Sequence, residues 1–335
     1  MGRGESGDLD RVSSSRTLSG VPADPAFTLP ARRPKRWQVT QASPPRGFGL
    51  HDFAVALMMN VLWGLNIIAV KMAVAAIAPL TAGFLRQVIV LLVCGTWLRI
   101  VPGRMRALTA LGILSGGLFY VATNFSLAVS GNVGALAIAG QLGVPFSMIL
   151  AIIVFRERIR LPRMAGIALS FAGVLLLVFD PAAAHEVPGL ALTALASFIW
   201  AMGSIIQRYL IGVSVLTIYA WIGFWGSIVL GLLAWRVEPQ AMAEIPNLPL
   251  HTLGWVAFSA IGSTVIGQGS MSYLLQRHPI SIVTPLTLAT PIISVFAASY
   301  YFGTPLTALM LTGGGIAMLG VAIVTIRTAR AGDSA

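Results

Sequence analysis

Two cations lie at the same distance from a tryptophan in two separate apolar stretches of this chain. Lys71 follows Trp63 by eight residues in the run VLWGLNIIAVK, and Arg208 follows Trp200 by eight residues in the run IWAMGSIIQR. A cation inside a hydrophobic segment is suited to bind an anionic group in a polar cavity. Two segments with matching spacing indicate a duplicated membrane unit whose halves meet around something polar.

A third cation, Arg86, lies about two turns inside the next apolar segment. A charge at the centre of a bilayer costs about 2.5–3.5 kcal/mol on insertion scales, so it usually faces a cavity or reaches the interface. We therefore predict that Lys71 and Arg86 attract the carboxylate of an amino-acid-like substrate in a central cavity. The alternative for Lys71 is that its long stem carries the ammonium out to the nearby membrane surface.

Neutral polar and aromatic side chains are predicted to form the walls of this cavity. They are Trp63, Asn66, Tyr120, Asn124, Gln141, Trp200, Gln207, Gln268 and Tyr273. For each amide the alternative is an interhelical hydrogen bond, worth about 0.6 kcal/mol on average in membrane proteins. Gln141 lies one turn before Pro145, where the missing backbone donor allows the helix to open locally. We predict Pro145, Pro291 and the charged-turn residue Glu157 as gating residues.

Composition places these residues in a multi-span membrane protein. Of the 335 residues 56% are hydrophobic and 10% charged, and the mean hydropathy is +0.84, whereas about 25% of residues are charged in soluble domains. The formal charge of +11 does not indicate a nucleic-acid partner, because eight of the 22 cations lie in residues 1–50 and most others lie at span ends. The single cysteine, Cys94, excludes an internal disulfide framework.

Residues 1–50 are expected to form a disordered, basic cytoplasmic tail. They are rich in Arg, Ser, Pro, Gly and Asp and contain no apolar run long enough to cross a bilayer. The basic run at 32–36 is suited to contact anionic lipid headgroups. Residues 328–335 form a second, short cytoplasmic tail in this interpretation.

The remainder divides at Pro, Gly and charge clusters into ten segments of about 20 residues, the length that spans a bilayer as a helix. The predicted spans are 52–74, 79–99, 106–129, 132–155, 161–179, 188–211, 214–235, 251–274, 279–302 and 306–327. Cations cluster in the turns on one side and carboxylates in the turns on the other. The positive-inside rule then predicts that both termini lie in the cytoplasm. The expected location is the plasma membrane, in a bacterium the inner membrane.

Five spans in each half require the second half to enter the membrane from the opposite side. The predicted fold is thus an all-α membrane protein with two inverted five-helix repeats, 52–179 and 188–327. Aligning Phe155 with Phe302 also aligns Gly166 with Gly313 and Gly173 with Gly320. Inverted repeats of this kind usually hold the substrate near the midplane and alternate access by rocking one half against the other.

The motifs in residues 53–327 resemble the drug/metabolite transporter superfamily, specifically its EamA-domain branch. The matching features are Trp63-Gly64-Leu65-Asn66 with Lys71, the segment from Pro79 to Arg86, the Phe-x-Glu motif at 155–157, and the segment from Gly166 to Val174. Within the branch, the Trp63–Asn66 motif with Lys71, taken together with Arg86 and Gln141, is most similar to exporters of O-acetylserine, cysteine and related amino-acid metabolites. The second repeat has Thr304 where the pattern usually has Glu.

The resemblance implies an inner-membrane exporter of small amino-acid-like metabolites that works by alternating access without a cofactor or metal. A broad-specificity drug exporter is the alternative, and an intramembrane enzyme is disfavoured because the sequence has no HExxH motif and no pair of Asp residues in adjacent spans. All four histidines lie near span ends, so no histidine is placed to relay protons through the middle of the membrane. Facilitated efflux and antiport that uses a titratable group near a span end therefore both stay open. The expected partners are a small solute and membrane lipids. The oligomeric state, a homodimer included, is not determined by the sequence.

Overall fold

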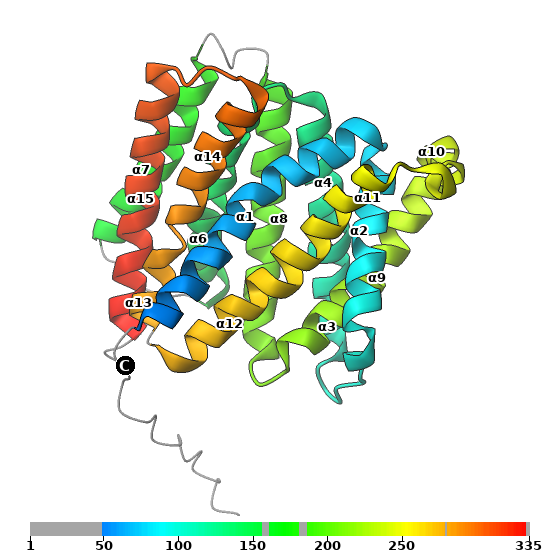
Figure 1. The fold of residues 1–335 in the computed structure, drawn as a ribbon. Helices are drawn as coiled ribbons and strands as arrows, with labels where there is room; N and C mark the ends of the chain where they lie inside the picture. Colours follow the sequence, from blue (N-terminus) through cyan, green and yellow to red (C-terminus); the bar gives the residue numbers. More distant parts are fainter. Residues whose placement is uncertain (1–48, 156–160, 181–185, 279, 333–335) are drawn as a thin grey trace, which may run out of the picture. The chain divides into compact units, whose positions relative to one another are not determined.

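The computed structural model describes residues 49–155, 161–180, 186–278 and 280–332. This part of the chain forms helices joined by short turns and contains no β-strand (Figure 1). Nearly all of the predicted N-terminal tail, and the gating candidate Glu157, lie outside the described residues. We call residues 49–180 the first half and residues 186–332 the second half.

The first half contains five long helical stretches, three of which change helix type along their length. The elements are α1 (Leu50–Ala76); α2 (Pro79–Cys94) with the 3-10 turn η1 (Gly95–Trp97); α3 (Met105–Leu111), the π-helix η2 (Gly112–Leu118) and α4 (Phe119–Val129); α5 (Val133–Ala139), the 3-10 turn η3 (Gly140–Leu142) and α6 (Gly143–Phe155); and α7 (Leu161–Val178).

The second half repeats much of this plan. Its elements are α8 (Val187–Gln207) with the 3-10 turn η5 (Arg208–Leu210); α9 (Val215–Val237); the short α10 (Pro239–Ala243) and η6 (Ile245–Asn247); α11 (Leu250–Ala257), the π-helix η7 (Phe258–Gly267) and α12 (Gln268–Arg277); α13 (Ile280–Leu286); α14 (Ala289–Phe302); and α15 (Ala308–Gly332).

Nine of the described helical stretches are long and apolar enough to cross a membrane. The predicted span 279–302 differs, because it is divided into α13 and the 14-residue α14. Pro285 and Pro291 explain the division, because neither has a backbone N–H to donate to the preceding turn of a helix. Between them, hydrogen bonds between residues three apart replace the α-helical pattern: Leu288 N bonds Pro285 O, and Thr290 N bonds Thr287 O. Pro291 is tolerated in α14 because it lies in the first turn.

The turns between helices lie at two ends of the bundle that differ in charge. One end, which we call the carboxylate end, holds the turns that follow α1, α4, α7, α9 and α14. The other, the arginine end, holds the start of α1 and the turns that follow η1, η5 and α12. The carboxylate end carries Asp180, Glu186, Glu238, Glu244 and one arginine, Arg236. The arginine end carries Arg99, Arg104, Arg106, Arg208 and Arg277.

Helices α7 and α15 pack at very short range through small residues. A Cβ added to Gly166 would lie 3.0 Å from the backbone oxygen of Gly320. One added to Gly173 would collide with the backbone of Gly313 and Ala317. Such glycine contacts allow helix backbones to approach closely in membranes, where dispersion replaces the hydrophobic effect as the main attraction. This pair therefore joins the two halves firmly.

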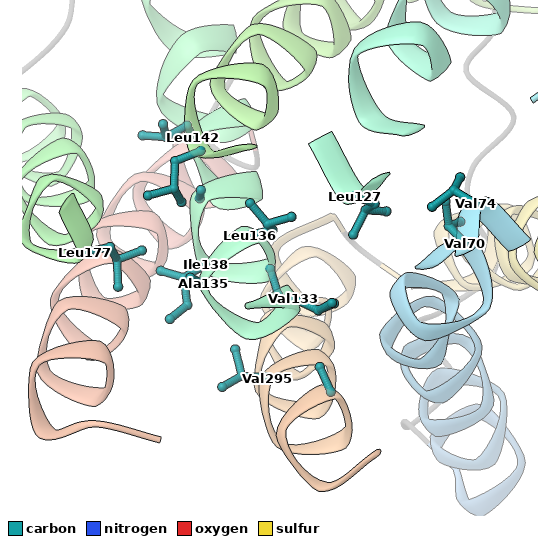
Figure 2. Close-up of a cluster of buried hydrophobic side chains, with 14 of the residues drawn as sticks. Val70, Val74, Leu127, Val133, Ala135, Leu136, Ile138, Leu142, Leu177 and Val295 are labelled. Carbon is teal, nitrogen blue, oxygen red and sulfur yellow. The ribbon is translucent and has the colours of Figure 1, made fainter. Parts of the chain in front are cut away.

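The largest apolar cluster of the described residues lies toward the carboxylate end. Figure 2 shows it where α1, α4, α5, α7 and α14 converge. Val133 is fully buried, and Val70, Leu127 and Leu136 are at least 94% buried. The cluster therefore fills the space between the halves on this side.

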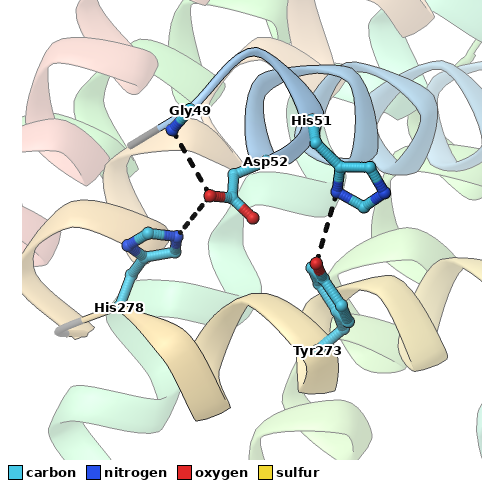
Figure 3. Close-up of polar contacts among 5 residues, drawn as sticks. All are labelled: Gly49, His51, Asp52, Tyr273 and His278. Atoms are coloured by element: carbon cyan, nitrogen blue, oxygen red, sulfur yellow. Dashed lines mark hydrogen bonds and ion pairs between the residues drawn. The ribbon is translucent and has the colours of Figure 1, made fainter. Parts of the chain in front are cut away.

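At the arginine end, polar contacts join the start of α1 to the end of α12 (Figure 3). His278 Nε2 lies 3.0 Å from Asp52 Oδ2, and the Gly49 backbone N–H donates to the same oxygen at 3.3 Å. His51 Nδ1 and the Tyr273 hydroxyl share a hydrogen bond of 3.3 Å. The two halves are therefore connected at this end as well, through a buried His278 and a partly exposed Asp52.

Candidate solute cavity

A cavity of about 480 Å³ lies between the two halves. Its volume falls within the range of roughly 300–1,000 Å³ that is typical of small-molecule sites. Eight of the eleven residues predicted to bind the solute or form the walls line it, namely Trp63, Asn66, Arg86, Tyr120, Gln141, Trp200, Gln207 and Gln268. These side chains come from six separate helical stretches of both halves, so only the folded chain brings them together.

Arg86 is the one formally charged residue among the described residues that line this cavity. It is 6% exposed. Its guanidinium donates to the hydroxyl of Ser259 and, at 2.8 Å, to that of Thr264. The Ser259 hydroxyl donates in turn to Asn66 Oδ1 at 2.7 Å. Arg86 is thus held between α1, α2 and η7.

The π-helix η7 explains how one helix supplies both hydroxyls. Ser259 and Thr264 are five residues apart, a separation that places side chains about 140° apart around an α-helix. A π-helix bonds residue i to i+5, with about 4.4 residues per turn, which reduces this angle to roughly 50°. Both hydroxyls therefore lie on the face that meets Arg86.

Arg86 retains hydrogen-bonding capacity beyond these two contacts. Its Nε–H is buried and has no hydrogen-bond partner among the described residues. The Tyr120 ring lies beneath the guanidinium, with 4.5 Å between Cζ and the ring centroid. A ring in this position stabilises a cation, and the planar fork of a guanidinium matches a carboxylate. The arrangement is suited to bind one anionic group.

Lys71 and Asn124 do not line the main cavity. Lys71 Nζ donates to the backbone oxygens of Leu127 at 2.6 Å and Ser130 at 2.5 Å, and so satisfies carbonyl groups at the end of α4. Asn124 Nδ2 donates to the backbone oxygen of Pro79 at 2.8 Å. Its side chain lines a separate hollow of about 10 Å³ behind Arg86. The structure brings only one of the two predicted cations to the cavity.

The two tryptophans form broad walls of the cavity. Trp63 Nε1 donates to the backbone oxygen of Ser263 at 3.0 Å, and its ring lies where a Cβ on Gly267 would be. The Trp200 ring lies against Gly143, 2.9 Å from the position of an added Cβ. Trp200 nevertheless remains 45% exposed. Both rings thus pack against a small residue and line the cavity.

The architecture and the cavity agree with what comparison with known proteins finds. The model of the EamA-like transporter family matches residues 53–179 and, a second time, residues 187–326. The chain belongs to this family. It is therefore a multi-pass membrane transporter that handles small solutes.

Relatives of this EamA-like transporter align along most of their length. Proteins of Salmonella typhimurium strain LT2 and Escherichia coli strain K12 are 28% and 27% identical to it, over 81% of this chain and 94% of each relative. Both bear the name "Probable amino-acid metabolite efflux pump". An "Uncharacterized transporter" of Archaeoglobus fulgidus is 27% identical over 82% of this chain and 99% of its own. A solved crystal structure shares the fold, with a TM-score of 0.58 at 16% identity over 84% of this chain and 98% of the other.

The predicted gating prolines of this EamA-like transporter both follow an interruption of a helix. Pro145 comes after the 3-10 turn η3, and Pro291 comes after the turn at 287–288. Both prolines are buried beside the cavity without lining it, while their neighbours Val144 and Thr290 do line it. Their role in gating stays a prediction.

Sequence reasoning missed several polar lining residues, among them Gln87, Ser115, Thr123, Tyr219, Ser263, Thr264 and Ser294. Hydroxyl groups in apolar segments were the available signal, but most such groups bond to their own helix. Gln207 lines the cavity as predicted. Tyr273 instead lies at the arginine end, where the Arg277 guanidinium stacks on its ring at 3.7 Å.

Proposed function

We propose that this transporter exports small amino-acid-like metabolites that carry a carboxylate, and that Arg86 binds this carboxylate. The buried guanidinium with an unpartnered Nε–H, in a cavity between the halves, is the observation on which the proposal rests. A buried cation is costly without a counter-charge. A carboxylate would supply that charge and accept charge-assisted hydrogen bonds. Trp63, Asn66, Tyr120, Gln141, Trp200 and Gln268 would contact the remainder of the solute.

The names of the two bacterial relatives support amino-acid metabolites as the solute class. The alternative of a broad-specificity drug exporter has no comparable support. In this proposal the chain is a carrier and not an enzyme. Lys71, which we predicted to share the carboxylate, is assigned instead to capping α4, and Asn124 to holding the start of α2.

The two halves, in this proposal, are inverted five-span repeats, with α13 and α14 together forming the ninth of ten crossings. The contacts of α7 with α15 support it. The alignment that equates Gly166 with Gly313 and Gly173 with Gly320 predicts that a two-fold axis would pair Gly166 with Gly320 and Gly173 with Gly313, and these are the observed contacts. In a contact with two-fold symmetry, residue i of one repeat touches residue j of the other, and residue j of the first touches residue i of the second.

Orientation follows from the charges of the turns. The arginine end would face the cytoplasm, together with both termini, and the carboxylate end would face the outside of the inner membrane. A cysteine placed at the exposed Glu244 tests this directly: an impermeant maleimide should label it in intact cells. Labelling only after the cells are opened would reverse the orientation.

Transport by reconstituted protein tests the solute proposal. Arg86→Gln should raise the KM for carboxylate-bearing solutes about tenfold or more, because a hydrogen bond to a charged group is worth roughly 1.5–3 kcal/mol. Arg236→Gln, which removes an exposed arginine at the carboxylate end, is the matched control. Solutes should first be found by a resistance screen against amino acids, their analogues and lipophilic cations. An unchanged KM in folded Arg86→Gln protein, or resistance confined to the lipophilic cations, would contradict the proposal.

A further inference from the structure

Three carboxylates at the carboxylate end each bind the start of a helix in the opposite half. Glu238, which follows α9 in the second half, accepts hydrogen bonds from the backbone N–H groups of Leu80 at 3.1 Å and Thr81 at 2.9 Å. The Thr81 hydroxyl also donates to it at 2.9 Å. These donors form the first turn of α2, whose N–H groups have no partner within their own helix. Glu238 therefore caps a helix of the first half.

Glu186 makes the equivalent contact to α5. It precedes α8 in the second half and accepts from the backbone N–H of Gly131 at 2.9 Å and of Asn132 at 3.0 Å. Asn132 is itself the N-cap of α5, since its Oδ1 accepts from the Ala135 N–H at 3.0 Å. Glu186 is 9% exposed. A buried carboxylate here is stabilised by N–H donors and by the positive end of a helix.

The third contact runs in the reverse direction, from the first half to the second. Asp180 follows α7, is 2% exposed, and accepts a hydrogen bond from the Thr307 hydroxyl. The same hydroxyl oxygen accepts from the Met310 N–H at 3.0 Å and thereby caps α15. All three carboxylates thus connect the halves at one end of the bundle.

The apolar cluster of Figure 2 lies at the same end of the bundle as these contacts. Val70, Leu127 and Leu136 belong both to this cluster and to the lining of the cavity, so the cluster closes the cavity toward the carboxylate end. In the other direction the lining extends to Gln207, the last residue of α8. A solute that is to leave at the carboxylate end must pass the cluster and separate the polar contacts.

We infer that Glu238 and Glu186 form the latch of an exit gate at the carboxylate end, and that export requires these two contacts to break, while Asp180 joins α7 to α15, which stay packed. The inference rests on the proposed alternating-access function. When the halves separate, each carboxylate and each helix start becomes accessible to water, which replaces the lost hydrogen bonds. The latch is therefore reversible, unlike the glycine contact between α7 and α15.

Cysteine labelling tests the latch without knowledge of the solute. Cys94 is the single cysteine of the sequence and is fully buried, so the parent protein serves as the unlabelled background. Ala137→Cys places a thiol on the cavity wall. Its labelling by an impermeant maleimide added at the carboxylate end should be slow. Adding Glu238→Gln should accelerate labelling about tenfold, the change that corresponds to one charge-assisted hydrogen bond.

Glu244→Gln is the matched control, because Glu244 is an exposed carboxylate at the same end and should leave labelling unchanged. Glu186→Gln is a second latch variant in case Glu238→Gln does not fold. Unchanged labelling in the folded latch variants would overturn the inference. Because labelling requires no solute, failure to find an exported metabolite would count against the proposed function and leave this result intact.

Cross-linking provides the converse test. A reducible thiol cross-linker that joins Thr81→Cys to Glu238→Cys should stop export, and reduction should restore it. The control joins Ser299→Cys to Thr304→Cys, which lie at the same end within the second half, where the Ser299 hydroxyl donates to the Thr304 backbone oxygen at 2.6 Å. This cross-link should permit export. Full export with the Thr81–Glu238 cross-link in place would show that this contact does not need to break.

Discussion

The two ends of the bundle both connect the halves, but by different chemistry. At the carboxylate end the acids are buried or partly buried and bind backbone N–H groups at helix starts. At the arginine end one arginine and one tryptophan reach exposed backbone carbonyls: Arg104 donates to the backbone oxygen of Tyr209, and Trp221 Nε1 donates to that of Arg99 at 2.9 Å. Among the described residues, the side chains of Asp52 and His278 also meet between the halves there.

The burial of these contacts indicates which end the fold holds closed. Breaking a single hydrogen bond of a buried carboxylate costs free energy, because the donor or acceptor left behind stays buried without a partner. Exposed contacts exchange readily with water and contribute little to stability. The cavity lining also extends toward the arginine end, at Gln207. The structure is therefore closed more firmly at its carboxylate end.

Glu186→Ala should have the largest effect on stability. It removes a buried acid and leaves the Gly131 and Asn132 N–H groups without their acceptor, which should lower the free energy of unfolding by about 3 kcal/mol. The measurement is reversible unfolding in mixed micelles. Glu244→Ala, at an exposed site on the same end, should change it by about 0.5 kcal/mol or less. Equal effects of the two variants would remove the distinction between latch and surface carboxylates.

Much of this architecture was predictable from the sequence, because hydropathy and loop charge are local properties. Nine of the ten predicted spans correspond to long helices, and Arg86 lines the cavity, since a cation within an apolar segment has few other positions that satisfy it. Ser259 and Thr264 were not predictable as partners, because their spacing of five fits neither helix nor strand and acquires meaning only in a π-helix. The position of Lys71 outside the cavity was not predictable either. The backbone carbonyls that accept its hydrogen bonds lie at the end of α4, which is distant in sequence.

Gly173→Ala should have the second largest effect, at a position between the two ends. The added methyl would collide with the backbone of Gly313 and Ala317, and overpacking of this kind costs about 1–3 kcal/mol. Gly315→Ala on α15 meets nothing within 4 Å and should be neutral or slightly stabilising, because alanine favours helix. Thermal unfolding in detergent would distinguish them. A stable Gly173→Ala protein would mean that α7 and α15 separate easily and do not join the halves firmly.

Ser259→Ala should act on solute affinity more than on stability. It removes one of the two hydroxyls that position the Arg86 guanidinium, so the KM for a carboxylate-bearing solute should rise about fivefold, the equivalent of roughly 1 kcal/mol. Ser272→Ala is the control, since within the described part of the chain the Ser272 hydroxyl bonds only to its own helix, at Gln268 O. The KM for a solute analogue without a carboxylate should not change. An equal loss for both solutes would assign Ser259 a purely structural role.

Asp52→Asn should have the smallest effect and is the strictest test of the difference between the ends. Asp52 is partly exposed and contacts His278 and the Gly49 N–H, and Asn keeps an oxygen acceptor for both. Its apparent Tm should fall by about 2 °C or less. A double-mutant cycle with His278→Gln should give a small coupling energy, because Asp52 is partly exposed and contacts open to solvent are weak. If the coupling matched that between Glu238 and Thr81, measured with Glu238→Gln and Thr81→Ala, the arginine end would be latched as firmly as the carboxylate end. The protein would then be occluded on both sides, and closure of the cavity would depend on two latches in place of one.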